Sequence, residues 1–106
     1  NFAFEWSQEH EPLGGHNDPQ DALRHAIWSA KMAYTYGEDY AKQWGDAHEI
    51  NPLQSIDEKS MDLFNNAVGR RIGGPAGLNL SAWPTVEQAV LNARNNGNLC
   101  LYVGDC

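Results

Sequence analysis

The segment from Pro19 to Tyr36 constrains the fold most, because its sequence predicts a helix that is covered on two sides. Asp18 is a typical N-cap residue, Pro19 suits the first helical position, and Gly37 ends the helix. At about 100° per residue, one face carries an apolar stripe and the nearly opposite face mixes ionisable with apolar side chains. The first stripe consists of Leu23, Ile27, Ala30 and Tyr34, and the second of Asp21, His25, Trp28 and Met32. A helix with apolar side chains on both faces should lie at the centre of the fold, with its polar groups partly buried.

Two further helices follow this segment. One is expected over about 39–50, and it ends at Asn51 because the following proline disfavours helical geometry there. The next begins at Ser55 and Glu58, which have the spacing of a capping box, and it runs to the Gly-Gly-Pro stop that starts at Gly73. The connections are short, so these helices should pack as neighbours.

The two ends of the chain are less regular. Residues 1–17 are expected to be extended, and residues 99–103 to form a short strand-like tail. A fourth helix begins near Thr85, where a second capping-box spacing occurs, and it ends near residues 95–97. With 106 residues and 42% hydrophobic side chains, the chain can build one small core. We therefore predict a predominantly α, single-domain bundle of about four helices over residues 1–106.

Charge and composition restrict the partners. The net charge of −7, with only 7 Lys and Arg residues, disfavours binding to nucleic acid, although it does not exclude a nuclease. No apolar run is long enough to span a bilayer. The chain begins at Asn1 without a Met, so we expect a processed product or a C-terminal fragment of a longer secreted protein. Cys100 and Cys106 are close enough in sequence to be bonded, which would imply an oxidising compartment, but the sequence leaves their pairing open.

The two later helices add polar residues beside apolar faces. His48 shares a face with Tyr40 and Trp44, and Glu49 follows it at the helix end, where it is either part of a site or solvated. The His-Glu pair is not the zinc motif H-E-x-x-H, because position 52 is Pro.

The helix that begins at Ser55 has its own apolar stripe. Met61, Phe64, Val68 and Ile72 form this predicted core stripe. Asn65 lies at the edge of the stripe, with Asp62 and Gly69 just beyond. A glycine inside a helix costs about 1 kcal/mol relative to alanine, so Gly69 indicates close approach by another backbone or a ligand. Arg70 either complements the helix dipole or belongs to the site.

Three ordered motifs resemble an uncharacterised bacterial domain family associated with secreted or toxin-like proteins. They are DAxRHxxWxA, an HE pair and MDxxNNxxGR, and the resemblance covers Asp21 to Gly73, about half of the chain. It carries no known mechanism and does not extend beyond Gly74. The matching positions are Asp21, Arg24, His25, Trp28, His48, Glu49, Asp62, Asn65, Asn66 and Arg70.

A cleft between these helices is the expected functional site. We favour a small hydrolase in which a histidine acts as general base or metal ligand, a carboxylate orients it, and an arginine stabilises developing negative charge. Such groups suit phosphodiester or lipid-linked phosphate substrates. The candidate catalytic residues are His25, Asp21, His48, Arg24 and Glu49, and the candidate substrate-binding residues are His16, Asp62, Asn65, Asn66, Arg70 and Trp28.

Several alternatives remain open at this stage. A peptidoglycan-cleaving enzyme would use Glu49 or Asp21 as the acid. A non-catalytic protein-binding module would instead use the same polar residues as a buried structural network, with Asp21 and His25 as a satisfied core pair. No compact ligand spacing demands a metal, so a divalent ion stays an open question. If the protein is an antibacterial toxin delivered to another cell, a cognate inhibitor or immunity protein is the expected partner.

Overall fold

The computed structural model describes residues 2–14 and 16–106, which form five α-helices and two short 3₁₀-helices. The α-helices are α1 (Phe2–His10), α2 (Pro19–Tyr36), α3 (Glu38–His48), α4 (Ile56–Gly73) and α5 (Trp83–Asn95). The 3₁₀-helices η1 (Gly74–Ala76) and η2 (Leu80–Ala82) join α4 to α5. No strand forms within the described ranges. The predominantly α fold predicted from the sequence is confirmed.

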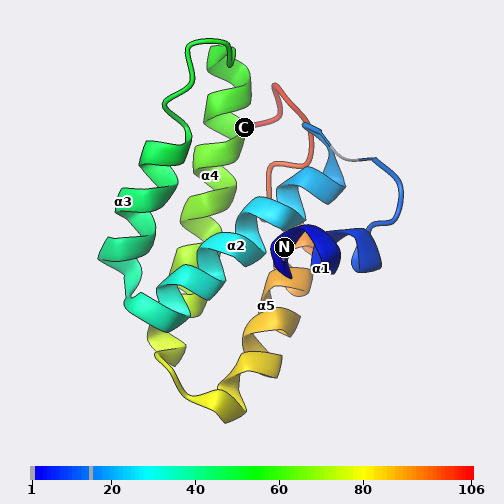
Figure 1. Cartoon of the computed structure of the whole chain (residues 1–106). Helices are drawn as coiled ribbons and strands as arrows, with labels where there is room; N and C mark the ends of the chain where they lie inside the picture. Colours follow the sequence, from blue (N-terminus) through cyan, green and yellow to red (C-terminus); the bar gives the residue numbers. More distant parts are fainter. Residues whose placement is uncertain (1, 15) are drawn as a thin grey trace.

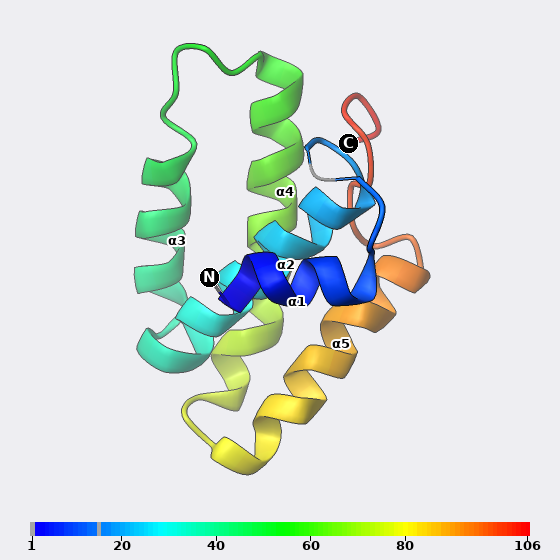
Figure 2. The same ribbon diagram turned by 45° about the vertical axis from the view of Figure 1, so that its right-hand side comes forward.

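Helix α2 lies at the centre and contacts each of the other four α-helices. In Figures 1 and 2, α3 and α4 run side by side on one side of α2, α5 lies on the other side, and α1 crosses over it. The predicted apolar stripe of α2 is buried in the main core, where Leu23 and Ile27 pack with Trp6, Val86 and Val90 from α1 and α5. Of the second stripe, Asp21 and His25 are buried and carry the polar site, whereas Trp28 and Met32 are half-buried and line a pocket with Phe2 and Ala3 of α1.

Local capping explains why α2 and α4 begin where the sequence predicts. The Asp18 side chain accepts a hydrogen bond from the Asp21 backbone N–H at 3.1 Å, and Gly37 ends α2 with a φ of 99°. At the start of α4, the Glu58 N–H donates to Ser55 Oγ at 3.1 Å and the Ser55 N–H donates to Glu58 Oε1 at 3.4 Å. These bonds satisfy backbone donors that a helix start leaves without partners.

A close crossing between α2 and α4 brings their polar faces together. A Cβ added to Gly69 would lie 2.0 Å from the carbonyl oxygen of Ala26, and one added to Gly73 would lie 2.1 Å from that of Ala30. The close backbone approach predicted from Gly69 is therefore present. Small residues on both helices allow this approach, so the polar side chains one and two turns away on α4 reach those of α2.

The buried face of α4 differs from the predicted apolar stripe. Its buried residues are Met61, Asp62, Asn65, Asn66, Gly69 and Gly73. Phe64 was expected in the core, but it is 46% exposed, and Val68 and Ile72 are only half-buried. The stripe prediction was wrong in this respect because the glycines, rather than the apolar side chains, set the direction in which α4 packs on α2.

The expectation of an extended N-terminal segment was also wrong, because residues 2–10 form α1. Ala3, Trp6 and Ser7 form its buried face, and Trp6 Nε1 donates to Glu87 Oε2 at 2.7 Å. Phe2 and Phe4 are exposed, so they obscure the helical pattern in so short a segment. Tertiary contact with α5 and α2 therefore stabilises a helix that periodicity alone does not predict.

The C-terminal tail packs on the helices without forming the predicted strand. The amide of Asn65 holds Cys100 through two hydrogen bonds of 2.8 Å, one in each direction with the Cys100 backbone. Cys100 forms a disulfide with Cys106, and their Cα atoms are 5.5 Å apart. The side-chain amide thus takes the place of a partner strand. In the part of the chain that the structure describes, no helix is both long and apolar enough to cross a membrane.

Candidate functional site

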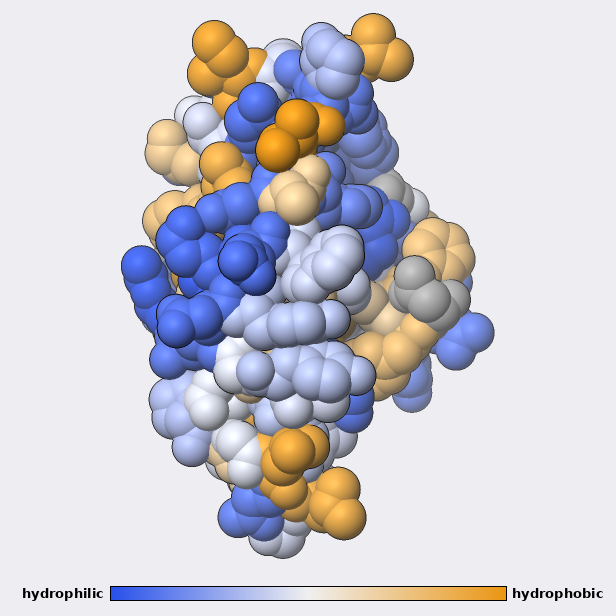
Figure 3. Space-filling model, turned by 60° about the vertical axis from the view of Figure 1, so that its left-hand side comes forward, coloured by the Kyte–Doolittle hydropathy of each residue, from blue (hydrophilic) through white to orange (hydrophobic). Residues whose placement is uncertain are grey.

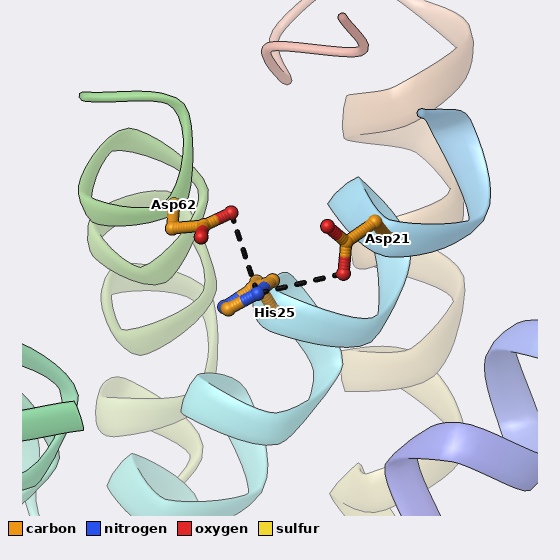
Figure 4. Close-up of side chains that lie close together, drawn as sticks. All are labelled: Asp21, His25 and Asp62. Atoms are coloured by element: carbon orange, nitrogen blue, oxygen red, sulfur yellow. Dashed lines mark ion pairs between the residues drawn. The ribbon is translucent and has the colours of Figure 1, made fainter. Parts of the chain in front are cut away.

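His25 is the centre of a buried polar cluster between α2, α3 and α4. Its side chain is about 9% exposed, and its Nδ1 lies within hydrogen-bonding distance of Asn66 Oδ1, at 3.2 Å. Its Nε2 lies 3.5 Å from Asp21 Oδ1 and 3.3 Å from Asp62 Oδ1. Figure 4 shows the two carboxylates approaching the imidazole from α2 and α4. The imidazole therefore has an amide on one side and two carboxyl groups on the other.

Asp21 is fixed by the start of α2. Its Oδ2 accepts the backbone N–H of Asn17 at 2.7 Å, and its Oδ1 is ion-paired with Arg24 Nη2 one turn further along the helix. Asn17 adopts a φ of 54°, which turns its N–H toward the helix. The loop before α2 and the guanidinium thus hold the carboxylate beside His25.

Glu49 and Asp62 form the third side of the cluster. Glu49 is the C-cap residue of α3, which ends just before the Asn-Pro pair, and its buried side chain turns inward. The Gln54 Nε2 donates to Glu49 Oε1 at 3.0 Å and to Asp62 Oδ2 at 2.7 Å. The remaining oxygens, Glu49 Oε2 and Asp62 Oδ1, are buried and receive no N–H donor in hydrogen-bond geometry within the described ranges, and the two carboxyl groups lie within hydrogen-bonding reach of each other when one of them holds a proton. Glu49 Oε2 lies 3.9 Å from His25 Nδ1.

Burial changes the ionisation of the whole cluster. It lowers the pKa of His25, although the negative charges of Asp21 and Glu49 partly oppose this shift. Burial, reinforced by the charge of Asp21, raises the pKa of Asp62 to about 6, and burial likewise raises the pKa of Glu49. Burial therefore favours the neutral form of the His25 imidazole, and Glu49 and Asp62 hold protons more readily than they would in water.

Two pockets meet at this cluster. The larger, about 300 Å³, is lined by Ala3, Phe4, Arg24, His25, Trp28 and His48. The smaller, about 170 Å³, is lined by His16, Asp21, Arg24, His25, His48, Glu49, Asn51, Gln54 and Asp62. Arg24, His25 and His48 line both, so the two pockets adjoin at these three side chains. Figure 3 shows the α3 side of the molecule, where hydrophilic side chains gather around the middle and apolar ones lie toward both ends.

Three residues of the cluster have the composition of a metal site. One ligand atom from each of Asp21, His25 and Asp62 can be chosen so that all three lie within 4.8 Å of one another, and all three residues are buried. One nitrogen and two carboxylate oxygens are ligands that divalent ions accept.

Comparison with known proteins places the chain in a family. Residues 1–97 match a family described as a domain of unknown function (DUF6973). The chain belongs to the DUF6973 family. No curated protein and no solved structure matches it. The predicted membership of an uncharacterised domain family is confirmed, and the DUF6973 match extends beyond the three motifs to include α1 and α5.

The DUF6973 domain gathers most of the predicted site residues. Asp21, Arg24, His25, Glu49, Asp62 and Asn66 form the cluster, and Trp28, His48 and His16 line its pockets. His48 is exposed at the rim, and its ring lies 5.1 Å from that of Trp28. The side chain of His16 is 76% exposed, and its Nε2 lies 3.4 Å from Glu58 Oε2. It therefore lies at the outer edge of the smaller pocket.

Two predicted binding residues lie elsewhere. Asn65 and Arg70 are not among the described residues that line either pocket. The Asn65 amide donates to and accepts from the Cys100 backbone, so it holds the C-terminal tail. Arg70 lies in the last turn of α4, where it complements the helix dipole.

Sequence reasoning missed two parts of the site. Gln54 joins Glu49 to Asp62 from an irregular loop, where no periodicity marks it. Ala3 and Phe4 line the larger pocket because α1 packs on α2. The sequence predicted an extended segment here, so it did not predict this part of the pocket. The place of Gln54 immediately before the N-cap residue Ser55 is the sequence signal that could have drawn attention to it.

Proposed function

We propose that this DUF6973 domain is a small hydrolase that cleaves phosphodiester or lipid-linked phosphate substrates at the His25 cluster. The observation that carries the proposal is the placement of a buried imidazole among three carboxyl groups, next to a pocket of about 300 Å³ that Arg24 also lines. Ionisable groups with shifted pKa values in a pocket are characteristic of catalytic sites. A purely structural salt bridge needs no adjoining pocket.

The proposed chemistry divides between the two pockets. A water molecule in the smaller pocket can pass a proton to the cluster, where the carboxyl groups of Asp62 and Glu49 line the pocket and are the candidate acceptors. The Arg24 guanidinium is about 29% exposed and reaches both pockets, so it can donate hydrogen bonds to a phosphoryl oxygen. His48 at the rim can donate a further hydrogen bond.

The lining of the larger pocket favours an ester that carries an apolar group. Ala3, Phe4 and Trp28 offer apolar surface opposite the polar wall of Arg24 and His25. The net charge of −7 disfavours a long nucleic-acid polymer. A small or lipid-linked phosphate ester therefore fits this site better than DNA or RNA.

Hydrolysis of a substrate panel tests the proposal. We would incubate the purified domain with bis(4-nitrophenyl) phosphate, phospholipid vesicles, a lipid-linked diphosphate and peptidoglycan, and compare wild type with His25→Asn. The matched control is His10→Asn, because His10 is exposed on α1 and outside both pockets. Turnover of a phosphate ester by wild type and His10→Asn, lost in a folded His25→Asn, supports the proposal.

Other outcomes would refute it. Cleavage of peptidoglycan alone would show that the carboxyl groups serve a glycosidase. No turnover of any substrate, with a large loss of stability in His25→Asn, would show a structural network in a non-catalytic module.

The same proposal includes a toxin-like, secreted role. It is supported by the Cys100–Cys106 disulfide, which forms most readily in an oxidising compartment. Expression in the bacterial cytoplasm and, separately, in the periplasm tests this role. Growth inhibition in one compartment that His25→Asn abolishes supports it, and harmless expression in both contradicts it. A producing cell would then require a cognate inhibitor.

A further inference from the structure

The ligand geometry around His25 points to a cation. We propose that Asp21, His25 and Asp62, with Glu49 beside them, bind one divalent transition-metal ion of the Zn²⁺ or Mn²⁺ type. The inference goes beyond the proposed function, since an ion can bind there whether or not the site is catalytic.

The orientation of the His25 ring provides the first argument. Its Nδ1 lies 3.2 Å from Asn66 Oδ1, and because an amide oxygen can only accept, a hydrogen bond here places the proton of the neutral imidazole on Nδ1 and leaves a lone pair on Nε2. That lone pair faces Asp21 Oδ1 and Asp62 Oδ1, at 3.5 and 3.3 Å. Three electron-rich atoms thus converge, as Figure 4 shows. A metal-bound histidine usually donates its other ring N–H to an oxygen in this way, which fixes its tautomer and orientation.

The buried carboxyl oxygens of Glu49 and Asp62 provide a second, independent argument. Glu49 is 3% exposed and comes from α3, a different helix from those that carry Asp21 and Asp62. Its Oε2 and Asp62 Oδ1 receive no N–H donor in hydrogen-bond geometry from the described residues, so the adjacent Glu49 and Asp62 carboxyl groups need either a shared proton or a cation between them. Both residues line the smaller pocket with His25. Buried charged atoms require compensation, and a cation at this point supplies it for both.

The distances fit a small metal ion. Ligand bonds of about 2.0 to 2.1 Å in tetrahedral geometry place neighbouring ligand atoms about 3.3 Å apart. The separations from His25 Nε2 to the two aspartate oxygens, 3.3 and 3.5 Å, are close to this value. The imidazole nitrogen favours a transition metal over Ca²⁺ or Mg²⁺, which prefer oxygen ligands only.

The charge of the site suits a divalent ion. Asp21, Asp62 and Glu49 supply three negative charges when ionised, and Arg24 supplies one positive charge through its pair with Asp21. A divalent cation neutralises the two negative charges that remain. Arg24 then acts as a positioning residue, since its guanidinium occupies one lone pair of Asp21 Oδ1 and leaves the other free to bind the metal.

Calorimetric titration of the whole chain tests the proposal. The purified protein is treated with EDTA, dialysed, and titrated separately with ZnCl₂, MnCl₂, MgCl₂ and CaCl₂ at pH 7. We expect one Zn²⁺ or Mn²⁺ per chain and weaker binding of Mg²⁺ and Ca²⁺. The variants Asp62→Asn and Glu49→Gln should each bind at least about tenfold more weakly. Asp57→Asn, which removes an exposed carboxylate from the first turn of the same helix, should bind as wild type does.

A spectroscopic measurement on wild type keeps the test independent of the variants. In a long-range ¹H–¹⁵N spectrum of the four histidines, diamagnetic Zn²⁺ should shift the Nε2 resonance of one buried ring and leave its Nδ1 protonated. Shifts confined to exposed rings, no saturable binding, preferential binding of Ca²⁺ or Mg²⁺, or binding unchanged in both cluster variants would overturn the metal site. Metal binding without hydrolysis would refute only the proposed function. Hydrolysis that persists in EDTA, without saturable binding, would refute only the metal site.

Discussion

The close crossing of α2 and α4 makes Gly69→Ala a sharp test of how the site is positioned. In an ordinary helix interior this substitution stabilises by about 1 kcal/mol. Here the added Cβ would lie 2.0 Å from the Ala26 carbonyl oxygen, whereas ordinary contact begins at 3.4 Å. The two backbones must separate by about 1.4 Å, the difference between these distances, because the Ala26 oxygen belongs to the main chain and cannot rotate away.

Separation on this scale should outweigh the gain in helix propensity. Overpacking of a rigid contact costs about 1 to 3 kcal/mol, and separating the helices also loses packing along the rest of the interface. We expect a net loss of about 2 kcal/mol, which corresponds to a fall in melting temperature of roughly 10 °C for a domain of this size. The same movement shifts Asp62 relative to His25.

Thermal unfolding followed by circular dichroism measures this effect. The matched control is Gly45→Ala in α3, where the added Cβ would lie 3.4 Å from the nearest atom, the Nδ2 of the Asn66 side chain. This control should keep or slightly raise the melting temperature. If Gly69→Ala unfolds at or above the wild-type temperature, the two helices are not held as closely as described and the reasoning fails.

Two further predictions concern the tail and the ionisation of the site. Cys106→Ser should lower the free energy of unfolding by about 2 kcal/mol, as should reduction of wild type, because the disulfide closes a short loop; equal melting temperatures of the oxidised, reduced and variant proteins would contradict this. The second prediction applies to the metal-free protein in EDTA. Burial raises the pKa of Asp62 from an ordinary 3.8 to about 6. Between these two pH values, the folded state therefore retains a proton that the unfolded state has lost. The stability of wild type relative to Asp62→Asn should therefore fall by about 2 kcal/mol as the pH rises from 4 to 7. Urea titrations of both proteins across this range measure the difference, and a constant or rising difference would show that burial does not raise this pKa.

The bounds of α2 and the start of α4 could be predicted because their signals are local. Asp18, Pro19 and Gly37 act on the backbone next to them, and the capping box at Ser55 needs only Glu58. The helix α1 could not be predicted, because its stability depends on contacts of Trp6 with residues about 80 positions away. The path of the C-terminal tail likewise depends on a distant residue, because Asn65 of α4 holds the Cys100 backbone.

The candidate site was predictable in its residue types and only partly in its geometry. Asp21 and His25 lie one turn apart on a helix that is covered on both sides, so their proximity follows from the sequence. Asn65 and Asn66 are adjacent but about 100° apart around α4. Which of them faces His25 depends on the side of α4 that packs on α2, and the glycines determine that side. Gln54 lies in a loop whose path no helical pattern specifies.

The central claim is that the His25 cluster performs hydrolysis. The most direct measurement compares kcat/KM for phosphodiester turnover by wild type, His25→Asn and His10→Asn, with each variant checked for folding. The account predicts that His25→Asn loses about 10²-fold or more while it remains folded, and that His10→Asn matches wild type. Equal activity of His25→Asn and wild type would contradict the claim.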